Sequence, residues 1–174
     1  MSVEEEVIQL LALRGVTVDD IAEIVLDLQK HYHPELTLAD CQENILRVLG
    51  KREVQHAILT GVALDMLAEK GALEQPLQAI MERDEPLYGV DEILALSITN
   101  VYGSIGLTNY GYLDKTKVGI LGRLNGDREH IHVFLDDLVA GVAAAAASRI
   151  AHEHGAASYS HTIGKDEKVV SLDD

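Results

Sequence analysis

Ten consecutive uncharged residues, from Leu138 to Ala147, place the strongest constraint on how this chain can fold. They lie inside a segment that predicts one long helix from about residue 130 to residue 154. A helix that is apolar on nearly every side has to be surrounded by other elements of the protein. The stretch is only half as long as a membrane-spanning helix, which needs about twenty apolar residues. We therefore expect this helix at the centre of a water-soluble domain.

The remainder of the chain favours helices over strands. Of its 174 residues, 47% are hydrophobic but only 4% are aromatic, so the core has to be aliphatic. Runs rich in Ala, Leu and Glu, with few prolines, are typical of helices. We predict an all-α, single-domain bundle of about six to seven helices over residues 1–155, followed by a flexible tail over residues 156–174. A second apolar helix, over residues 90–101, is expected beside the long one at the centre.

Local signals place several of the helix boundaries. Ser2, Thr17 and Thr37 each precede a helical pattern and are suited to cap its first turn. Two further helices are predicted, a long one over residues 52–70 and a short one over residues 76–83. Residues 102–112 contain three glycines and three tyrosines, which we expect to be too irregular for a plain helix. Asn125-Gly126 predicts a turn.

Charge limits the classes of partner. The chain has 14 Lys and Arg against 29 Asp and Glu, a formal net charge of −15, which disfavours nucleic acid and anionic lipid. The excess of acid fits either a solvated surface or carboxylates gathered around divalent cations. The single cysteine, Cys41, excludes an internal disulfide and is expected to pack in the core. The acidic start at Met1–Glu6 is unlike a signal peptide, so we expect a cytoplasmic protein.

Acidic residues inside apolar sequence are the best candidates for a functional site. Asp136 and Asp137 are flanked by apolar residues on both sides, so at least one of them should face the interior. A buried carboxylate needs a metal, a cation or several hydrogen-bond donors, and a salt bridge to Lys or Arg is the alternative to a metal. Asp65 falls on the stripe that Val54, Ile58 and other apolar residues of its helix form.

For other polar residues, a purely structural role is an alternative to a functional one. Asp91 and Glu92 begin the helix at residues 90–101, where acids also stabilise the helix dipole. Asp114 and Lys117 could recognise a phosphate or belong to a solvated loop. His130 and His132 are two residues apart, which on a helix would direct them to different sides, and we expect them on the surface.

Four segments in this order resemble the phosphatidylglycerophosphatase A family, and most of all its soluble branch, which is related to low-temperature requirement protein C of Gram-positive bacteria. They are Ala63-Leu64-Asp65-Met66 for A-x-D-M, Asp84 ahead of Val90-Asp91-Glu92 for a spaced acid and V-D-E, Leu113-Asp114-Lys115-Thr116-Lys117 for L-D-x-x-K-P, with Val118 in place of the proline, and Asp136-Asp137-Leu138-Val139-Ala140-Gly141-Val142 for D-D-I/L-V/M-A-G-V. The match runs from about residue 57 to residue 150. The early P-G-T-x-G-S motif and the spanning segments of the membrane members are absent from this sequence.

The resemblance implies a Mg²⁺-dependent (or Mn²⁺-dependent) phosphatase that hydrolyses phosphatidylglycerophosphate to phosphatidylglycerol. The metal ligands that it implies are Asp84, Asp91, Glu92, Asp136 and Asp137. The catalytic residues that it implies are Lys117, which would hold phosphate oxygens, Asp114, which could also be a ligand, and Asp65, as either a ligand or a general base.

Two other functions stay open at this point. The missing membrane segments favour a soluble phosphatase or pyrophosphatase that acts on a small phosphorylated metabolite. The missing early motif favours a non-catalytic helical regulatory or interaction protein. A soluble relative of a membrane fold has apolar faces to cover, so we also expect a homo-oligomer.

Overall fold

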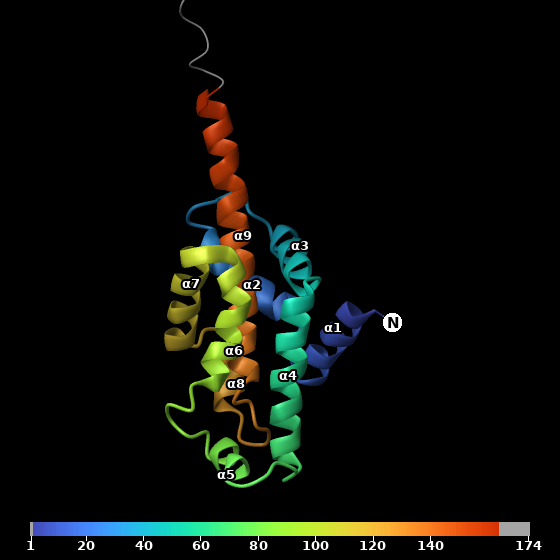
Figure 1. Cartoon of the computed structure of the whole chain (residues 1–174). Helices are drawn as coiled ribbons and strands as arrows, with labels where there is room; N and C mark the ends of the chain where they lie inside the picture. The colour runs from blue at the N-terminus through green and yellow to red at the C-terminus, as the bar shows by residue number, and fades with distance from the viewer. Residues whose placement is uncertain (1, 164–174) are drawn as a thin grey trace, which may run out of the picture.

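The computed structural model describes the backbone of residues 2–163, with side chains described as far as residue 153 (Figure 1). The predicted all-α class is confirmed, because these residues form α-helices and one short 3-10 turn. The α-helices are α1 (Val3–Leu13), α2 (Val18–Gln29), α3 (Leu38–Leu49), α4 (Arg52–Glu69), α5 (Leu77–Glu82), α6 (Val90–Thr99), α7 (Gly103–Thr116), α8 (Ile120–Gly126) and α9 (Leu135–Ile163). None of these helices combines the length and apolar content that crossing a membrane requires.

The first three helices begin where the sequence predicts. Ser2, Thr17 and Thr37 are the N-caps of α1, α2 and α3, and each accepts a hydrogen bond from the backbone N–H three residues later. The carboxylate of the residue at that position in turn accepts a hydrogen bond from the backbone N–H of the cap residue, which completes a capping box. These starts depend only on residues within one turn, so sequence alone is enough to place them.

Helix α9 is the central element, as predicted. It packs against α2, α3, α4, α6, α7 and α8, which surround it (Figure 1). The alanines from Ala143 to Ala147 are fully buried, and their small side chains let neighbouring helices approach closely. Gly61 of α4 shows how close this approach is, since a Cβ atom there would lie 2.6 Å from Leu138 Cδ1 and 2.9 Å from Phe134 Cβ. This packing fixes the start of α9 against α4.

The ends of α9 differ from the prediction. The helix begins at Leu135 rather than near residue 130, so residues 127–134 form a loop that precedes it. It continues to Ile163, so residues 156–163, which we expected in a flexible tail, are helical. The rest of that expected tail, residues 164–174, lies outside the described part of the chain.

There are more helices than the six to seven predicted, because α7 and α8 form where none was expected. In α7, glycine permits tight packing: a Cβ atom at Gly106 would lie 3.0 Å from the Thr99 carbonyl oxygen and 3.3 Å from Ser148 Oγ on α9. Tyr110 and Leu113 of α7 are also buried. Contact with the central helix therefore outweighs the low helix propensity of this glycine-rich segment.

Helix α6 is less buried than predicted. Its Ala95, Ile98 and Thr99 face the core, but Ile93 is 66% exposed and Val90 is 50% exposed. Its sequence is apolar on nearly every side, but α4, α7 and α9 do not cover its outer face. Of the two helices that we expected at the centre, α6 and α9, only α9 is therefore surrounded on all sides.

Candidate functional site

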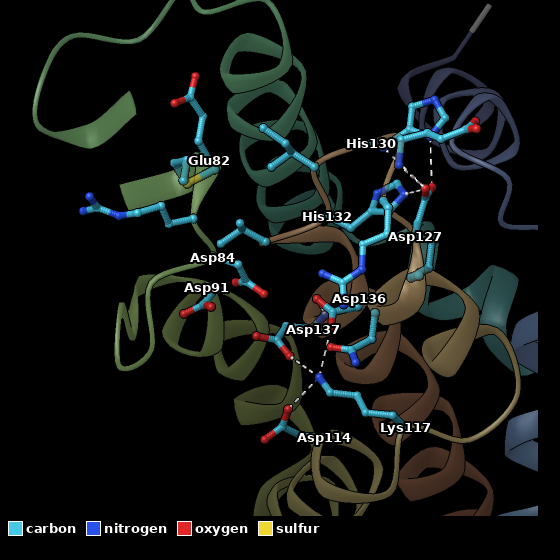
Figure 2. Close-up of a pocket in the computed structure, with 18 of the residues that line it drawn as sticks. Glu82, Asp84, Asp91, Asp114, Lys117, Asp127, His130, His132, Asp136 and Asp137 are labelled. Carbon is cyan, nitrogen blue, oxygen red and sulfur yellow. Dashed lines mark hydrogen bonds and ion pairs between the residues drawn. The ribbon is translucent and has the colours of Figure 1, made fainter. Parts of the chain in front are cut away.

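Most of the predicted site residues line one cavity of about 380 Å³ at the end of the bundle where α6 and α9 begin. Its acidic wall comes from four parts of the chain: the loop after α5, the start of α6, the end of α7 and the start of α9. Figure 2 shows several of these carboxylates directed towards a common centre. The predicted residues that line it are Asp84, Asp91, Glu92, Asp114, Lys117, Asp136 and Asp137.

Lys117 is the cation at the centre of the acidic wall. Its Nζ lies 2.8 Å from Asp114 Oδ1, 2.9 Å from Asp136 Oδ2 and 3.4 Å from Asp137 Oδ1 (Figure 2). Lys117 ends α7 in the left-handed conformation, with φ of 46°, and Asp84 has a similar φ of 47°. A residue other than glycine rarely adopts this conformation, which costs of order 1–3 kcal/mol and recurs at functional sites.

Asp136 and Asp137 are both buried, so the prediction that at least one faces the interior is confirmed. The salt bridge that we considered as the alternative to a metal is present, because both contact Lys117. One cation does not compensate for this crowding of acids. Burial and the charge of Asp136 raise the pKa of Asp137 to about 8, although Lys117 opposes the shift. Burial likewise raises the pKa of Asp136 above its ordinary value.

Asp91 adds a further uncompensated group to the acidic wall. Its Oδ1 atom is buried and has no hydrogen-bond partner in the described residues. The N-cap of α6 is Gly89, and no side chain caps that helix with a hydrogen bond. Asp91 and Glu92 nevertheless lie in the first turn of α6, where acids stabilise the helix dipole as we considered. A buried carboxylate oxygen without a donor is costly unless another group satisfies it.

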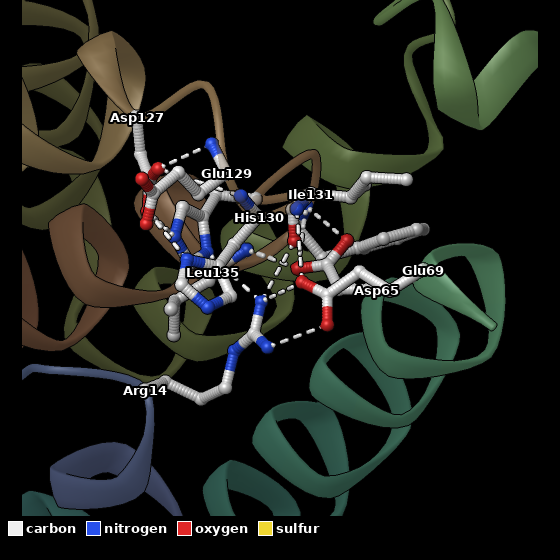
Figure 3. A network of polar contacts seen from close by, with 10 residues as sticks. Arg14, Asp65, Glu69, Asp127, Glu129, His130, Ile131 and Leu135 are labelled. Carbon is white, nitrogen blue, oxygen red and sulfur yellow. Dashed lines mark hydrogen bonds and ion pairs between the residues drawn. The ribbon is translucent and has the colours of Figure 1, made fainter.

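Asp65 is fully buried, as its place on an apolar stripe predicted, but it does not line the cavity. Its carboxylate accepts the backbone N–H of Phe134 at 3.1 Å and of Leu135 at 3.0 Å, where α9 begins (Figure 3). Burial raises the pKa of Asp65 to about 7, and these two hydrogen bonds oppose the shift. Asp65 thus connects α4 to the start of α9, directly before Asp136 and Asp137 in the chain.

A second polar group lines the same cavity, and the sequence analysis missed it. Asp127 Oδ2 lies 2.9 Å from His130 Nδ1 and 3.0 Å from His132 Nε2. The expectation that both histidines lie on the surface is wrong for His132, whose side chain is only 5% exposed. The two rings meet at Asp127 because residues 127–134 are a loop, whereas helical geometry would separate them. The spacing D-x-x-H-x-H was the available signal. It directly follows Asn125-Gly126, which we expected to be a turn but which form the end of α8.

Arg14 contacts His132 and the loop that carries this group. It forms a salt bridge to Glu69 at 2.6 Å and donates to the Ile131 carbonyl oxygen at 2.9 Å (Figure 3). The same Nη2 atom lies 3.1 Å from His132 Nδ1. The backbone N–H of Ile131 also donates to Glu69, at 2.9 Å. These contacts hold the loop before α9 against α1 and α4.

The two groups offer different ligands to a metal. The acidic wall supplies only carboxylate oxygens, which suit Mg²⁺. Asp127, His130 and His132 each place a ligand atom within 4.8 Å of the others and could hold a metal ion through mixed oxygen and nitrogen donors. In Figure 2 the two groups lie towards opposite ends of the cavity.

Comparison with known proteins agrees with the fold and with the order of the motifs. The sequence is 61% identical to the uncharacterized protein YpjQ of Bacillus subtilis over 83% of this chain and 82% of that protein. It is 62% identical to YutG of the same organism over 80% of this chain and 84% of that protein. The crystal structure of low temperature requirement C protein from Listeria monocytogenes matches with a TM-score of 0.86 and 60% identity, covering 89% of this chain and 98% of that one.

The crystal structure of YpjQ matches with a TM-score of 0.84 and 58% identity, over 88% of this chain and 95% of that one. The family model for phosphatidylglycerophosphatase A matches residues 8–152, a range that contains all of the predicted site residues and the Asp127 group. This chain therefore belongs to the phosphatidylglycerophosphatase A family.

Proposed function

We propose that this protein is a divalent-metal-dependent phosphatase that removes the terminal phosphate of phosphatidylglycerophosphate. The observation that carries the proposal is the convergence of carboxylates from separate elements on one lysine in a cavity, within a chain of this family. Carboxylates and an ammonium group around one cavity are typical of sites that position a phosphate with a metal ion.

The residues of the acidic wall fit Mg²⁺ or Mn²⁺. The donors are hard oxygen atoms, and Asp91 Oδ1 is buried without a partner in the described residues. Burial raises the pKa of Asp136, and burial together with the charge of Asp136 raises the pKa of Asp137. Each of these features disfavours the site without a cation and favours it with one. Asp84, Asp91, Asp136 and Asp137 would hold the ion, with Glu92 and Asp114 at the edge of the same wall.

Each residue has a distinct part in this proposal. A bound Mg²⁺ ion would supply charge neutralisation for the phosphate and a more acidic water. Lys117 neutralises Asp114, Asp136 and Asp137, and its ammonium group is placed to bind phosphate oxygens that enter the cavity. Asp65 acts indirectly: it fixes the first turn of α9 and therefore the position of the acid pair.

A small phosphorylated metabolite is the second candidate substrate. The cavity is lined mainly by charged and polar side chains, with Met81, Leu124, Ile131 and Val133 as its apolar residues. Such a lining suits the phosphate and glycerol parts of a substrate, and these parts are common to a lipid headgroup and to a soluble phosphomonoester.

Phosphate release from phosphatidylglycerophosphate in detergent micelles, compared with release from soluble phosphomonoesters and pyrophosphate, tests the proposal. We expect Mg²⁺-dependent or Mn²⁺-dependent release from the lipid, and Asp136→Asn should lower it by about two orders of magnitude or more. Glu23→Gln, an exposed acid on α2, serves as the matched control. Release from soluble esters alone would favour the second candidate. A folded protein that releases phosphate from none of them with either metal would favour the non-catalytic alternative.

A further inference from the structure

The group formed by Asp127, His130 and His132 has the composition of a transition-metal site. Two imidazoles and one carboxylate are common ligands of Zn²⁺, and imidazole nitrogen favours such ions over Mg²⁺. When tetrahedral ligands bind Zn²⁺ at about 2.0 Å, their donor atoms are roughly 3.3 Å apart. The distances of 2.9 Å and 3.0 Å from Asp127 Oδ2 to the two ring nitrogens are close to that spacing.

The loop holds these side chains in place before any ion binds. Asp127 Oδ1 accepts the backbone N–H of Glu129 at 2.8 Å, which directs Oδ2 towards both imidazole rings. The side chain of His132 is only 5% exposed and contacts Arg14 and Asp127, whereas the side chain of His130 is 52% exposed at the rim. The site therefore has one rigid wall and one side open to solvent, which suits three protein ligands and an exchangeable position.

The protonation states of the anchored residues also suit a metal. The backbone N–H of Glu129, together with the His130 and His132 side chains, holds the pKa of Asp127 below its usual range. Burial lowers the pKa of His132, which favours the neutral ring. An ionised carboxylate and a neutral imidazole are the forms that bind metal.

Metal binding has a definable cost at His132. In the hydrogen-bonded arrangement, Nδ1 faces Arg14 Nη2, so Nε2 carries the proton that it donates to Asp127. An ion bound at Nε2 takes the place of this proton, which moves to Nδ1 so that the ring stays neutral. The Arg14 Nη2 group has two hydrogens but three acceptors within 3.1 Å, so it can give up His132 and keep Glu69 and Ile131.

We propose that Asp127, His130 and His132 bind a divalent transition-metal ion of the zinc class, at a site separate from the acidic wall. The ion would link the two ends of the loop that leads into α9. This inference does not depend on the proposed phosphatase activity, because it concerns binding by a different set of ligands at the other end of the cavity (Figure 2).

Cobalt binding to the full chain tests the proposal directly. The chelator-treated protein is titrated with Co²⁺ in excess Mg²⁺, which occupies oxygen-only sites, and visible absorption is recorded. We expect one equivalent to bind and Zn²⁺, which favours a tetrahedral set of imidazole and carboxylate ligands, to displace it. The spectrum should lack a thiolate charge-transfer band, because Cys41 is buried in the core.

Matched variants identify the ligands. His130→Gln, at an exposed position that the fold tolerates, should weaken Co²⁺ binding about tenfold or more, and Asp127→Asn should do the same. Co²⁺ binding should be unchanged in His56→Gln, which replaces an exposed histidine on α4, and in Asp136→Asn on the acidic wall. The melting temperature without metal checks that each variant is folded. Unchanged binding in His130→Gln, or binding lost in Asp136→Asn and kept in His130→Gln, would overturn the assignment.

Discussion

Replacing Asp65 separates its structural role from a catalytic one. Asp65→Ala removes the only acceptor that the structure gives to the N–H groups of Phe134 and Leu135, both of which are buried. Each buried N–H left without a partner costs about 1–3 kcal/mol. Removing a helix cap typically costs about 1 kcal/mol, and this cost is already included in that of the unpaired N–H groups. At pH 5.5 we expect Asp65→Ala to lower the free energy of unfolding by about 2–4 kcal/mol.

This loss should depend on pH in a defined direction. The pKa of Asp65 is raised from 3.8 to about 7, so the folded protein keeps a proton that the unfolded chain has lost in this range. The stability that this proton contributes is complete below about pH 4 and declines as the pH rises to 7. The difference between the wild type and Asp65→Ala should therefore shrink by about 2 kcal/mol from pH 5.5 to pH 7. The other acids are present in both proteins, so this difference isolates Asp65.

Urea unfolding at pH 5.5 and at pH 7 measures both quantities, and a thermal scan should show a fall of roughly 5–15 °C at the lower pH. Asp65→Asn is the control, since its amide oxygen can still accept from Leu135; it should cost about 1 kcal/mol or less and keep most of the phosphatase activity. A loss below 1 kcal/mol in Asp65→Ala at both pH values would refute the capping role. Lost activity with unchanged stability in Asp65→Asn would instead establish Asp65 as a catalytic base.

Four further predictions follow from the packing and the charges. Gly61→Ala should lower the free energy of unfolding by about 1–3 kcal/mol in chemical denaturation, because its Cβ would overlap Leu138 and Phe134; a gain would mean that α4 and α9 can separate without cost. Asp137→Asn should leave the metal-free melting temperature unchanged or higher, because it removes a buried negative charge next to that of Asp136. It should also reduce the rise in melting temperature that Mg²⁺ causes. A marked drop without metal would mean that the main role of Asp137 is its ion pair with Lys117. Lys117→Ala should destabilise the metal-free protein more at pH 8 than at pH 5, because at pH 8 the acids around Lys117 ionise and no ammonium group is left to balance them. Equal losses of stability at both pH values would contradict this. Light scattering should show a homo-oligomer that covers the exposed apolar residues of α6 and α7, and a monomer at micromolar concentration would count against it.

The sequence by itself was enough for features that depend on neighbouring residues. The three N-cap residues, the aliphatic core and the central position of the helix around Leu138–Ala147 were all predicted. The burial of Asp65, and of at least one of Asp136 and Asp137, also followed from local pattern, because these acids lie among apolar residues that have to face the core. The family motifs then named most of the acids that the fold brings together in one cavity.

Only the tertiary structure decided which distant groups meet. Asp65 reaches the N–H groups of Phe134 and Leu135 because α4 packs against α9, a contact between residues about seventy positions apart that no local pattern encodes. The glycine-rich α7 is helical because its contact with α9 outweighs its propensity. The loop before α9 allows His130 and His132 to meet at Asp127, where a continuous helix would direct them apart. Local sequence sets where helices can begin and which side must be buried, whereas packing between helices sets where they end and which side chains face each other.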